Sequence, residues 1–466
     1  MRQSNTKRKA NKSVKTRRTS RALRQMNHNA AGIDIGSREH YVAVPPERSD
    51  RPVRKFGCLT PDLHELAKWL KECKITSVVM ESTGVYWIPV MEVLESYDFD
   101  VFLVDARHAR NLPGRKTDVE DCQWLQELHT YGLLSPAFRP HQDILPLRNY
   151  WRQRADLIEQ CTRQIHHMQK SLEQLNLQLH KVLSDITGVT GMHIIRSIVN
   201  GQRDPLTLAR MRHGTLKNSE ATFVKALTGN YRDDHLFALK QALELHDIYQ
   251  EKIADLDIQI ERYMSTLESK ADLQNLPPQS TQKAQGKRRK NQPHFDLREQ
   301  LYRLTGVDLT QVDGINAMTA QTVITEQGID MSRFLTEKHF ASHLGLCPNN
   351  QITGGRIIRR KSRKVQSRAA KALRIAAQSL HRSPTALGAF YRRMRARLGP
   401  AKAITATAHK LAKLIYRMLK HGQAYVDKGQ DAYEKDYKER LMKNLLRQAK
   451  RLGCEILILE TGEIVS

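Results

Sequence analysis

The chain has 466 residues, a length that allows two or three domains, each with its own hydrophobic core. It carries 76 Lys and Arg against 49 Asp and Glu, a formal charge of +27, which makes a polyanion such as nucleic acid the expected partner. There is neither an apolar run near the ~20 residues that span a bilayer nor a signal-peptide pattern, so we expect a soluble intracellular protein without a membrane partner.

The first segment, residues 1–29, is predicted to be a disordered basic tail. It contains Lys and Arg throughout, no acidic residue and almost no large apolar residue. The overall charge favours contact with DNA or RNA, and a merely solubilising extension is the alternative.

Residues 30–144 alternate short β-rich runs with amphipathic helices, which predicts an α/β layer around a mixed or parallel sheet. Functional residues of such sheets gather at strand ends. We expect strands at 31–44, 54–59, 77–80 and 100–104, and helices at 61–73 and 87–97.

Asp34 lies in the apolar run Ala-Gly-Ile-Asp-Ile-Gly-Ser, where an unpaired carboxylate would be costly to desolvate. A cation is therefore expected to face it. An apolar strand with one Asp followed by Gly opens ribonuclease-H-like folds, in which the carboxylate binds metal, but actin-like ATPases begin in a similar way.

Glu81 ends a second apolar strand, and Asp118 and Asp121 stand three residues apart at a predicted helix start, where they share one face. Four carboxylates are thus available to one site. Two divalent cations about 4 Å apart require such oxygen ligands in phosphodiester chemistry. The alternative makes Asp118 a helix cap and Asp121 an acid favoured by the helix dipole, but leaves Asp34 and Glu81 unexplained. Asp105, after the last strand, is a candidate to support the ligands.

Residues 145–270 are predicted to form a helical arm, and 271–296 a linker to the last domain. Within 151–185 apolar residues recur every three or four positions, as in the seam of a coiled coil. With a second long helix at 235–268 this suggests an antiparallel hairpin, and a plain helical bundle is the alternative. The seam residues are Leu157, Cys161, Ile165, Met168, Leu172, Leu175 and Leu179.

The last domain, 297–466, is expected to be mostly helical, with a short hairpin at 454–465. Its segment Val312-Asp313-Gly314-Ile315 is similar to a helix-hairpin-helix turn, whose backbone amides receive a phosphate. An ordinary connection between two helices is the alternative.

Thr353 stands before two glycines and a dense basic segment. A hydroxyl in this position could attack phosphorus, while the alternative is a loop that only binds phosphate. The residues expected to bind nucleic acid are Gly354, Gly355, Arg356, Arg359, Arg360, Lys361, Arg363, Lys364 and Arg368, and Ser362 and Ser367 are fallback hydroxyls.

Taken together, these motifs closely resemble the DEDD transposases of insertion-sequence family 110, group 1111. The resemblance rests on Asp34 in Gly-Ile-Asp-Ile-Gly, Glu81 in Glu-Ser-Thr-Gly-Val-Tyr-Trp, and Asp118 with Asp121 in Lys-Thr-Asp-Val-Glu-Asp. The later elements Gly-Leu-Cys-Pro and Thr-Gly-Gly-Arg match the second half of the family, and the whole match spans about residues 31–419.

The resemblance implies a RuvC-type N-terminal domain that uses Mg²⁺, with Mn²⁺ as the alternative metal, a coiled-coil arm and a C-terminal transposase domain. It implies a recombinase of the bacterial or archaeal cytoplasm, associated with the nucleoid, that acts as a dimer or tetramer on donor and target DNA paired with a bridge RNA. Family members carry Ser where this chain has Thr353. That serine links covalently to DNA, and a partner subunit completes the acidic site. The β-methyl of threonine stiffens χ1 and crowds an in-line attack.

Two other functions stay open at this point. A structure-selective nuclease that resolves junctions would use water in place of Thr353. A non-catalytic protein that only binds nucleic acid would need none of the four acids.

Overall fold

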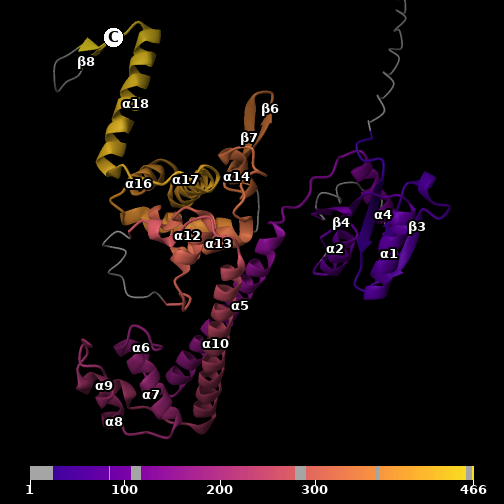
Figure 1. Ribbon diagram of the computed structural model, residues 1–466. Coiled ribbons are helices and arrows are strands. Elements are labelled where there is room, and N and C mark those ends of the chain that lie inside the picture. The colour runs from indigo at the N-terminus through magenta and orange to yellow at the C-terminus, as the bar shows by residue number, and fades with distance from the viewer. Residues whose placement is uncertain are drawn as a thin grey trace, which may run out of the picture. The chain divides into compact units, whose positions relative to one another are not determined.

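The computed structural model describes residues 25–82, 84–105, 117–278, 290–362, 367–457 and 464–465. It forms two compact units, Met1–Arg139 and Pro140–Ser466, each of which is considered by itself (Figure 1). Most of the predicted basic tail, the centre of the predicted linker, and Arg363 and Lys364 lie outside the described residues, as do the side chains of Arg360, Lys361 and Ser362.

The first unit is built on a five-stranded mixed sheet with strand order β3-β2-β1-β4-β5. The first three strands form an antiparallel meander, whereas β4 and β5 run parallel to β1. This confirms the expected α/β layer, but the single strand expected at 31–44 was wrong, because the chain turns back between two strands. The strands are β1 (Ala30–Ile35), β2 (Glu39–Ala43), β3 (Val53–Gly57), β4 (Ser77–Glu81) and β5 (Asp100–Val104).

Helices cover both faces of this sheet. α1 (Thr60–Glu72) and α2 (Trp87–Ser96) pack on one face, where Ile33 and Met80 lie in a core with Leu66 and Leu94. α4 (Asp118–Thr130) covers the other face through Leu125, which packs with Val79 and Val104. A short 3-10 helix, η1 (Pro46–Arg48), joins β2 to β3. Both faces of the parallel strands are therefore covered by helices and shielded from solvent, which explains their continuous apolar sequence.

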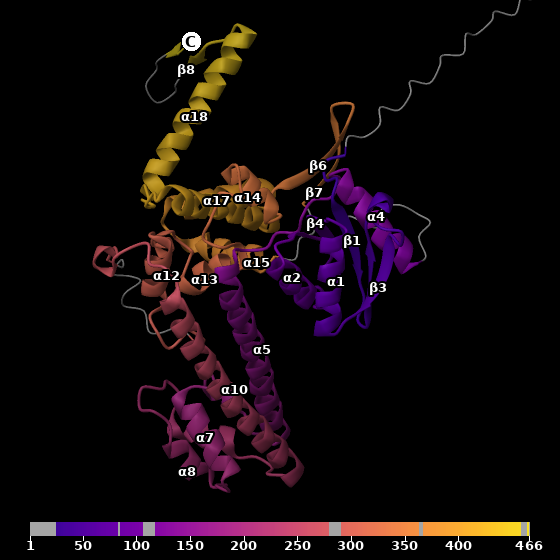
Figure 2. The ribbon, with the colours of Figure 1, turned by 45° about the vertical axis from the view of Figure 1, so that its right-hand side comes forward.

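The second unit begins with two long helices, α5 (Leu145–Gln174) and α10 (Asp233–Thr266), which lie side by side in both views (Figure 2). They are antiparallel, because Arg154 pairs with Asp257 and, farther along α5, Cys161 accepts a hydrogen bond from Gln250. The residues of the predicted seam are all buried or half-buried, but α5 ends at Gln174, so the last two seam residues, Leu175 and Leu179, lie beyond this helix. The short helix η2 (Gln142–Ile144) precedes α5, and four short helices lie between α5 and α10 in the chain: α6 (Leu179–Val182), α7 (Val189–Val199), α8 (Pro205–Arg210) and α9 (Glu220–Leu227).

The rest of the second unit is mostly helical, as expected, with a β-hairpin (β6 and β7) where the sequence predicts a loop. Among the described residues no helix is long and apolar enough to cross a bilayer. The elements are η3 (Leu273–Asn275), α12 (Leu297–Thr305), η4 (Leu309–Gln311), α13 (Ala317–Gln327), α14 (Glu337–His343), β6 (Pro348–Thr353), β7 (Arg356–Ser362), α15 (Arg368–Ser379), η5 (Leu380–Arg382), α16 (Ala386–Leu398), α17 (Pro400–His421), α18 (Gly429–Leu452), β8 (Ile456–Leu457) and β9 (Ile464–Val465).

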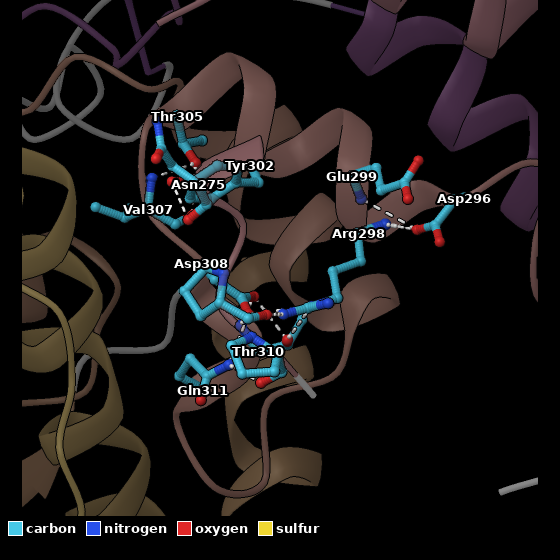
Figure 3. Close-up of polar contacts among 12 residues, drawn as sticks. Asn275, Asp296, Arg298, Glu299, Tyr302, Thr305, Val307, Asp308, Thr310 and Gln311 are labelled. Carbon is cyan, nitrogen blue, oxygen red and sulfur yellow. Dashed lines mark hydrogen bonds and ion pairs between the residues drawn. The ribbon is translucent and has the colours of Figure 1, made fainter. Parts of the chain in front are cut away.

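The turn that is similar to a helix-hairpin-helix lies between η4 and α13. Asp308 fixes its beginning by accepting hydrogen bonds from Arg298, Thr310 and Gln311, which keep the pKa of this carboxyl below its usual range although burial acts against ionisation (Figure 3). A Cβ on Gly314 would lie 2.7 Å from the Ala376 carbonyl oxygen of α15. Packing against α15 thus accounts for the glycine, and phosphate binding at this turn stays a prediction.

Candidate active site

Asp34 is the last residue but one of β1, and Glu81 ends the neighbouring parallel strand β4. In the register of β1 and β4, Gly32 is paired with Val79 and Ile33 with Met80, so the next residues along the two strands are Asp34 and Glu81. Side chains alternate between faces, which puts Asp34 on the same face as Gly32, two residues earlier. That is the face covered by α4, because Val79 packs against Leu125 there.

Gly32 allows α4 to lie directly on β1. A Cβ on Gly32 would stand 2.4 Å from the Cys122 carbonyl oxygen and 2.4 Å from the Gln126 nitrogen, closer than any side chain tolerates. Farther along the helix, buried His129 shares a hydrogen bond of 2.6 Å with Ser77 at the start of β4. Helix α4 is therefore fixed to the sheet at two levels, which sets the position of its first turn.

That first turn carries Asp118 and Asp121. They precede Cys122 by four residues and by one, so both stand on the N-terminal side of the contact with Gly32, toward Asp34. The idea that Asp118 caps the helix was wrong, because the cap is Thr117, whose hydroxyl accepts a hydrogen bond of 3.3 Å from the Glu120 nitrogen. Asp118 is thus the first helical residue and its carboxylate is not used as a cap.

The four carboxylates influence one another. The pKa of Asp34 is raised to about 6, first by burial and then by the negative charges of Asp118, Asp121 and Glu81, in that order. Within the part of the chain that the structure describes, no three His, Cys, Asp or Glu side chains stand ready to hold a metal ion. The acids therefore converge on Asp34 closely enough to resist its ionisation, without forming a closed set of ligands. Asp105 follows β5 and is exposed, and its basic neighbours lie outside the described residues.

Two further residues border these acids and were missed in the sequence. Tyr41 on β2 is paired with Asp34, and its hydroxyl donates a hydrogen bond of 3.1 Å to Glu39. Cys122 is fully buried, and burial together with the charges of Asp34 and Asp121 raises the pKa of its thiol to about 12. Recognition of the β1–β2 turn would have revealed Tyr41. Prediction of the surroundings of the Cys122 thiol would require knowing which face of the sheet α4 covers.

Thr353 belongs to the second unit and ends strand β6. It is paired with Arg356 across a two-residue turn of Gly354 and Gly355, whose φ values are +55° and +77°. Positive φ at both central residues is the geometry of a tight hairpin and favours glycine. Thr353 and both glycines are exposed, with nothing within 4 Å of a Cβ on either glycine. The predicted loop is therefore the tip of a β-hairpin.

The basic residues of this region belong to two elements. Arg356 and Arg359 are exposed on β7, while Arg368 begins α15 and forms an exposed ion pair with Asp156 at 3.5 Å. Ser367, a fallback hydroxyl, caps α15 by accepting a hydrogen bond of 3.1 Å from the Ala370 nitrogen. Of the remaining predicted contacts, Arg360 and Lys361 lie on β7, as does Ser362, the other fallback hydroxyl.

Comparison with known proteins places two separate stretches of this chain in one family. Residues 31–177 match a transposase model for the DEDD transposases of IS110 elements, and this stretch contains all four acids. Residues 307–392 match a second model, described as the transposase IS116/IS110/IS902 family, and this stretch contains the hairpin with Thr353. A search of curated proteins found no match. Transposases cut and recombine DNA, and the chain belongs to the IS110 family of these enzymes.

Proposed function

We propose that this transposase cleaves and joins DNA with a divalent metal held by Asp34, Glu81, Asp118 and Asp121, and with the hydroxyl of Thr353 as nucleophile. The observation that carries the proposal is the concentration of negative charge at Asp34, where burial and three other carboxylates raise its pKa to about 6. A lone structural aspartate has no reason to be placed among three like charges.

The acids fit a hard divalent cation. All four offer only oxygen atoms, as Mg²⁺ prefers, and Mn²⁺ accepts the same ligands. A phosphodiester is itself an anion, so four carboxylates would repel it unless positive charge lies between them. When bound, the metal would supply that charge and stabilise the oxygen that leaves phosphorus. Small movements of the first turn of α4 and of the end of β4 are enough to complete the ligand set, because both carry their acids at an element end.

In the proposed reaction the Thr353 oxygen attacks phosphorus while its proton passes to solvent. A Thr–O–P ester forms as one P–O bond of the DNA breaks, and the released strand end takes up a proton as a free hydroxyl. Attack on this ester by the hydroxyl of another strand reverses the step and regenerates Thr353. Arg356, paired with Thr353, would offset charge on the phosphate.

The Asp118→Asn variant tests the role of the acids. Loss of one negative ligand should abolish cleavage of DNA while DNA binding, which rests on the basic residues, persists. Binding is measured by gel shift in EDTA, and cleavage on the same DNA in Mg²⁺. Cleavage at the rate of the unchanged protein would remove metal catalysis from the proposal and leave a nucleic-acid-binding protein.

Variants of Thr353 separate the transposase from a junction-resolving nuclease. Thr353→Ala should abolish both the covalent protein–DNA product and strand joining, whereas Thr353→Ser should retain them, because serine offers the same oxygen without the β-methyl. Both products are resolved on denaturing gels. A nuclease that activates water would still cut DNA after Thr353→Ala.

The finer architecture follows the same proposal. The strand order with β2 antiparallel supports a RuvC type of ribonuclease-H-like fold for the first unit, and the buried seam of α5 and α10 supports a coiled-coil arm. A bridge RNA and an assembly of two or four chains, acting on donor and target DNA in the nucleoid, are further parts of the proposal. Sequencing of the RNA that copurifies with the full chain tests the guide, because one discrete structured species is expected and its absence would favour a protein that acts on DNA alone.

A further inference from the structure

Helix α18 is a long helix with an exposed apolar stripe. None of its 24 residues is buried, and three of its leucines are widely exposed: the exposed fraction is 47% for Leu441, 44% for Leu445 and 78% for Leu452. With Tyr437 these residues follow one another at intervals of four, four and seven, so at ~100° per residue they fall within a sector of about 80°. A stripe of this kind on a helix normally faces another helix. The helix also lies beyond both stretches matched by the transposase models.

Among the described residues, the contacts that hold α18 to the rest of its chain lie at the beginning of the helix. Arg393 of α16 lies over the rings of Tyr433 and Tyr437, and its guanidinium donates a hydrogen bond of 3.1 Å to the Tyr433 hydroxyl. Phe390 also packs against Tyr433. Beyond its beginning, α18 extends away from α16 and α17 in both views (Figures 1 and 2). The exposed leucines thus belong to the half that is not anchored.

The charges of the two halves of α18 differ. The first half, residues 429–440, contains four acidic and three basic residues, a net charge of −1, whereas the second, 441–452, contains four basic residues and no acid, a net charge of +4. Two parallel copies would place +4 beside +4, but two antiparallel copies whose axis is level with Lys443 place each basic half beside residues 434–445, which carry three acids and four bases, a net charge of only +1. Charge therefore selects the antiparallel arrangement.

We infer that α18 is a self-association helix, which pairs antiparallel with α18 of a second copy of this chain about a two-fold axis level with Lys443. At this register Leu441 of one copy is level with Leu445 of the other, and each copy presents the same surface. The helix is about 36 Å long at 1.5 Å per residue, so one stripe buries less than the ~800 Å² per partner of a standard interface. The contact is therefore weak alone and strengthens when two copies are held on one DNA.

The double variant Leu441→Asp/Leu445→Asp tests the surface in the full chain. Sedimentation velocity should show self-association at least ~tenfold weaker than in the unchanged protein, because four aspartates replace the leucines at the centre of the pair. Leu335→Asp, at a side chain that is 80% exposed outside α18, is the matched control and should leave association unchanged. Equal association of the double variant and the control would overturn the inference. So would a loss of DNA binding without any change in association, which would make α18 a nucleic-acid contact.

Cross-linking tests the orientation independently of any loss of folding. In a chain with the exposed Cys58 and Cys454 changed to Ser, Asn444→Cys is one residue from the axis and should form a disulfide between copies. Leu452→Cys is nine residues from the axis, so antiparallel copies would hold the two thiols about 27 Å apart along the helix. Efficient cross-linking at Leu452→Cys would indicate parallel pairing, and cross-linking at neither position would overturn the pairing itself.

Discussion

Asp34→Asn should stabilise the metal-free first unit at neutral pH. The pKa of Asp34 is raised from 3.8 to about 6, about two pKa units, which corresponds to ~3 kcal/mol for a fully buried group. Asp34 is only partly buried, so solvent screening reduces this to ~1–2 kcal/mol. Asparagine has nearly the same shape and carries no charge, and it escapes this cost of ionisation.

The sign of the effect follows from linkage. Because the folded state raises the pKa, it holds the proton more tightly than the unfolded chain between about pH 4 and pH 6. The unchanged protein should therefore lose stability as pH rises through this window, and the Asn variant should not. The two proteins are expected to be equally stable at pH 4 and to differ by ~1–2 kcal/mol at pH 7.5.

Urea unfolding in EDTA measures this difference through tryptophan fluorescence. Three of the four tryptophans, Trp69, Trp87 and Trp124, belong to the first unit, so the signal reports mainly on its unfolding. Asp50→Asn, at an exposed carboxylate of the same unit, is the control. The reasoning is refuted if Asp34→Asn lowers stability at pH 7.5, or if its effect is the same at pH 4 and pH 7.5. In Mg²⁺ the order should reverse, because only the unchanged protein keeps the complete ligand set.

Two other predictions concern packing. Gly32→Ala places a methyl 2.4 Å from the Cys122 carbonyl oxygen, so it should lower the free energy of unfolding in urea by ~1–3 kcal/mol and lower the cleavage rate by moving α4. Gly214→Ala, whose added Cβ would have nothing within 4 Å, is the control and should change neither quantity. Cleavage by Gly32→Ala at the rate of the unchanged protein would contradict the placement of the site. Arg154→Met should cost ~3–5 kcal/mol, because it leaves Asp257 buried without its ion pair, and Arg154→Met with Asp257→Leu should recover part of that loss. Equal stability of the single and double variants would show that the pair does not act as a unit.

The family and the α/β layer were accessible from the sequence because they depend on local patterns. Apolar runs that end in Asp34 and Glu81 identify strand ends, and parallel pairing then brings those ends together. The turn after Ile35 is not marked in the sequence, because the apolar pattern continues on both sides of it and predicts one strand where the structure has two. The approach of α4 to Gly32 was also out of reach, since it depends on which helix covers which face.

The β6–β7 hairpin escaped prediction for a different reason. Its side chains from Pro348 to Arg359 are all exposed, so no alternation of apolar and polar residues marks the strands. The hairpin is held by its own ladder of backbone hydrogen bonds. The available signal was the pair Gly354-Gly355, which is typical of a two-residue hairpin turn. It was interpreted as room for a phosphate, and the two roles are compatible.

A hairpin whose described side chains, from Pro348 to Arg359, are all exposed has an evolutionary consequence. Substitutions on Thr353 or its neighbours change what the ribbon can touch but remove nothing from the core, so most of them should leave the free energy of unfolding within about 0.5 kcal/mol of its original value. The hairpin that carries the proposed nucleophile can then diverge without compensating changes elsewhere, and an exchange between serine and threonine at position 353 is of the kind that such freedom permits.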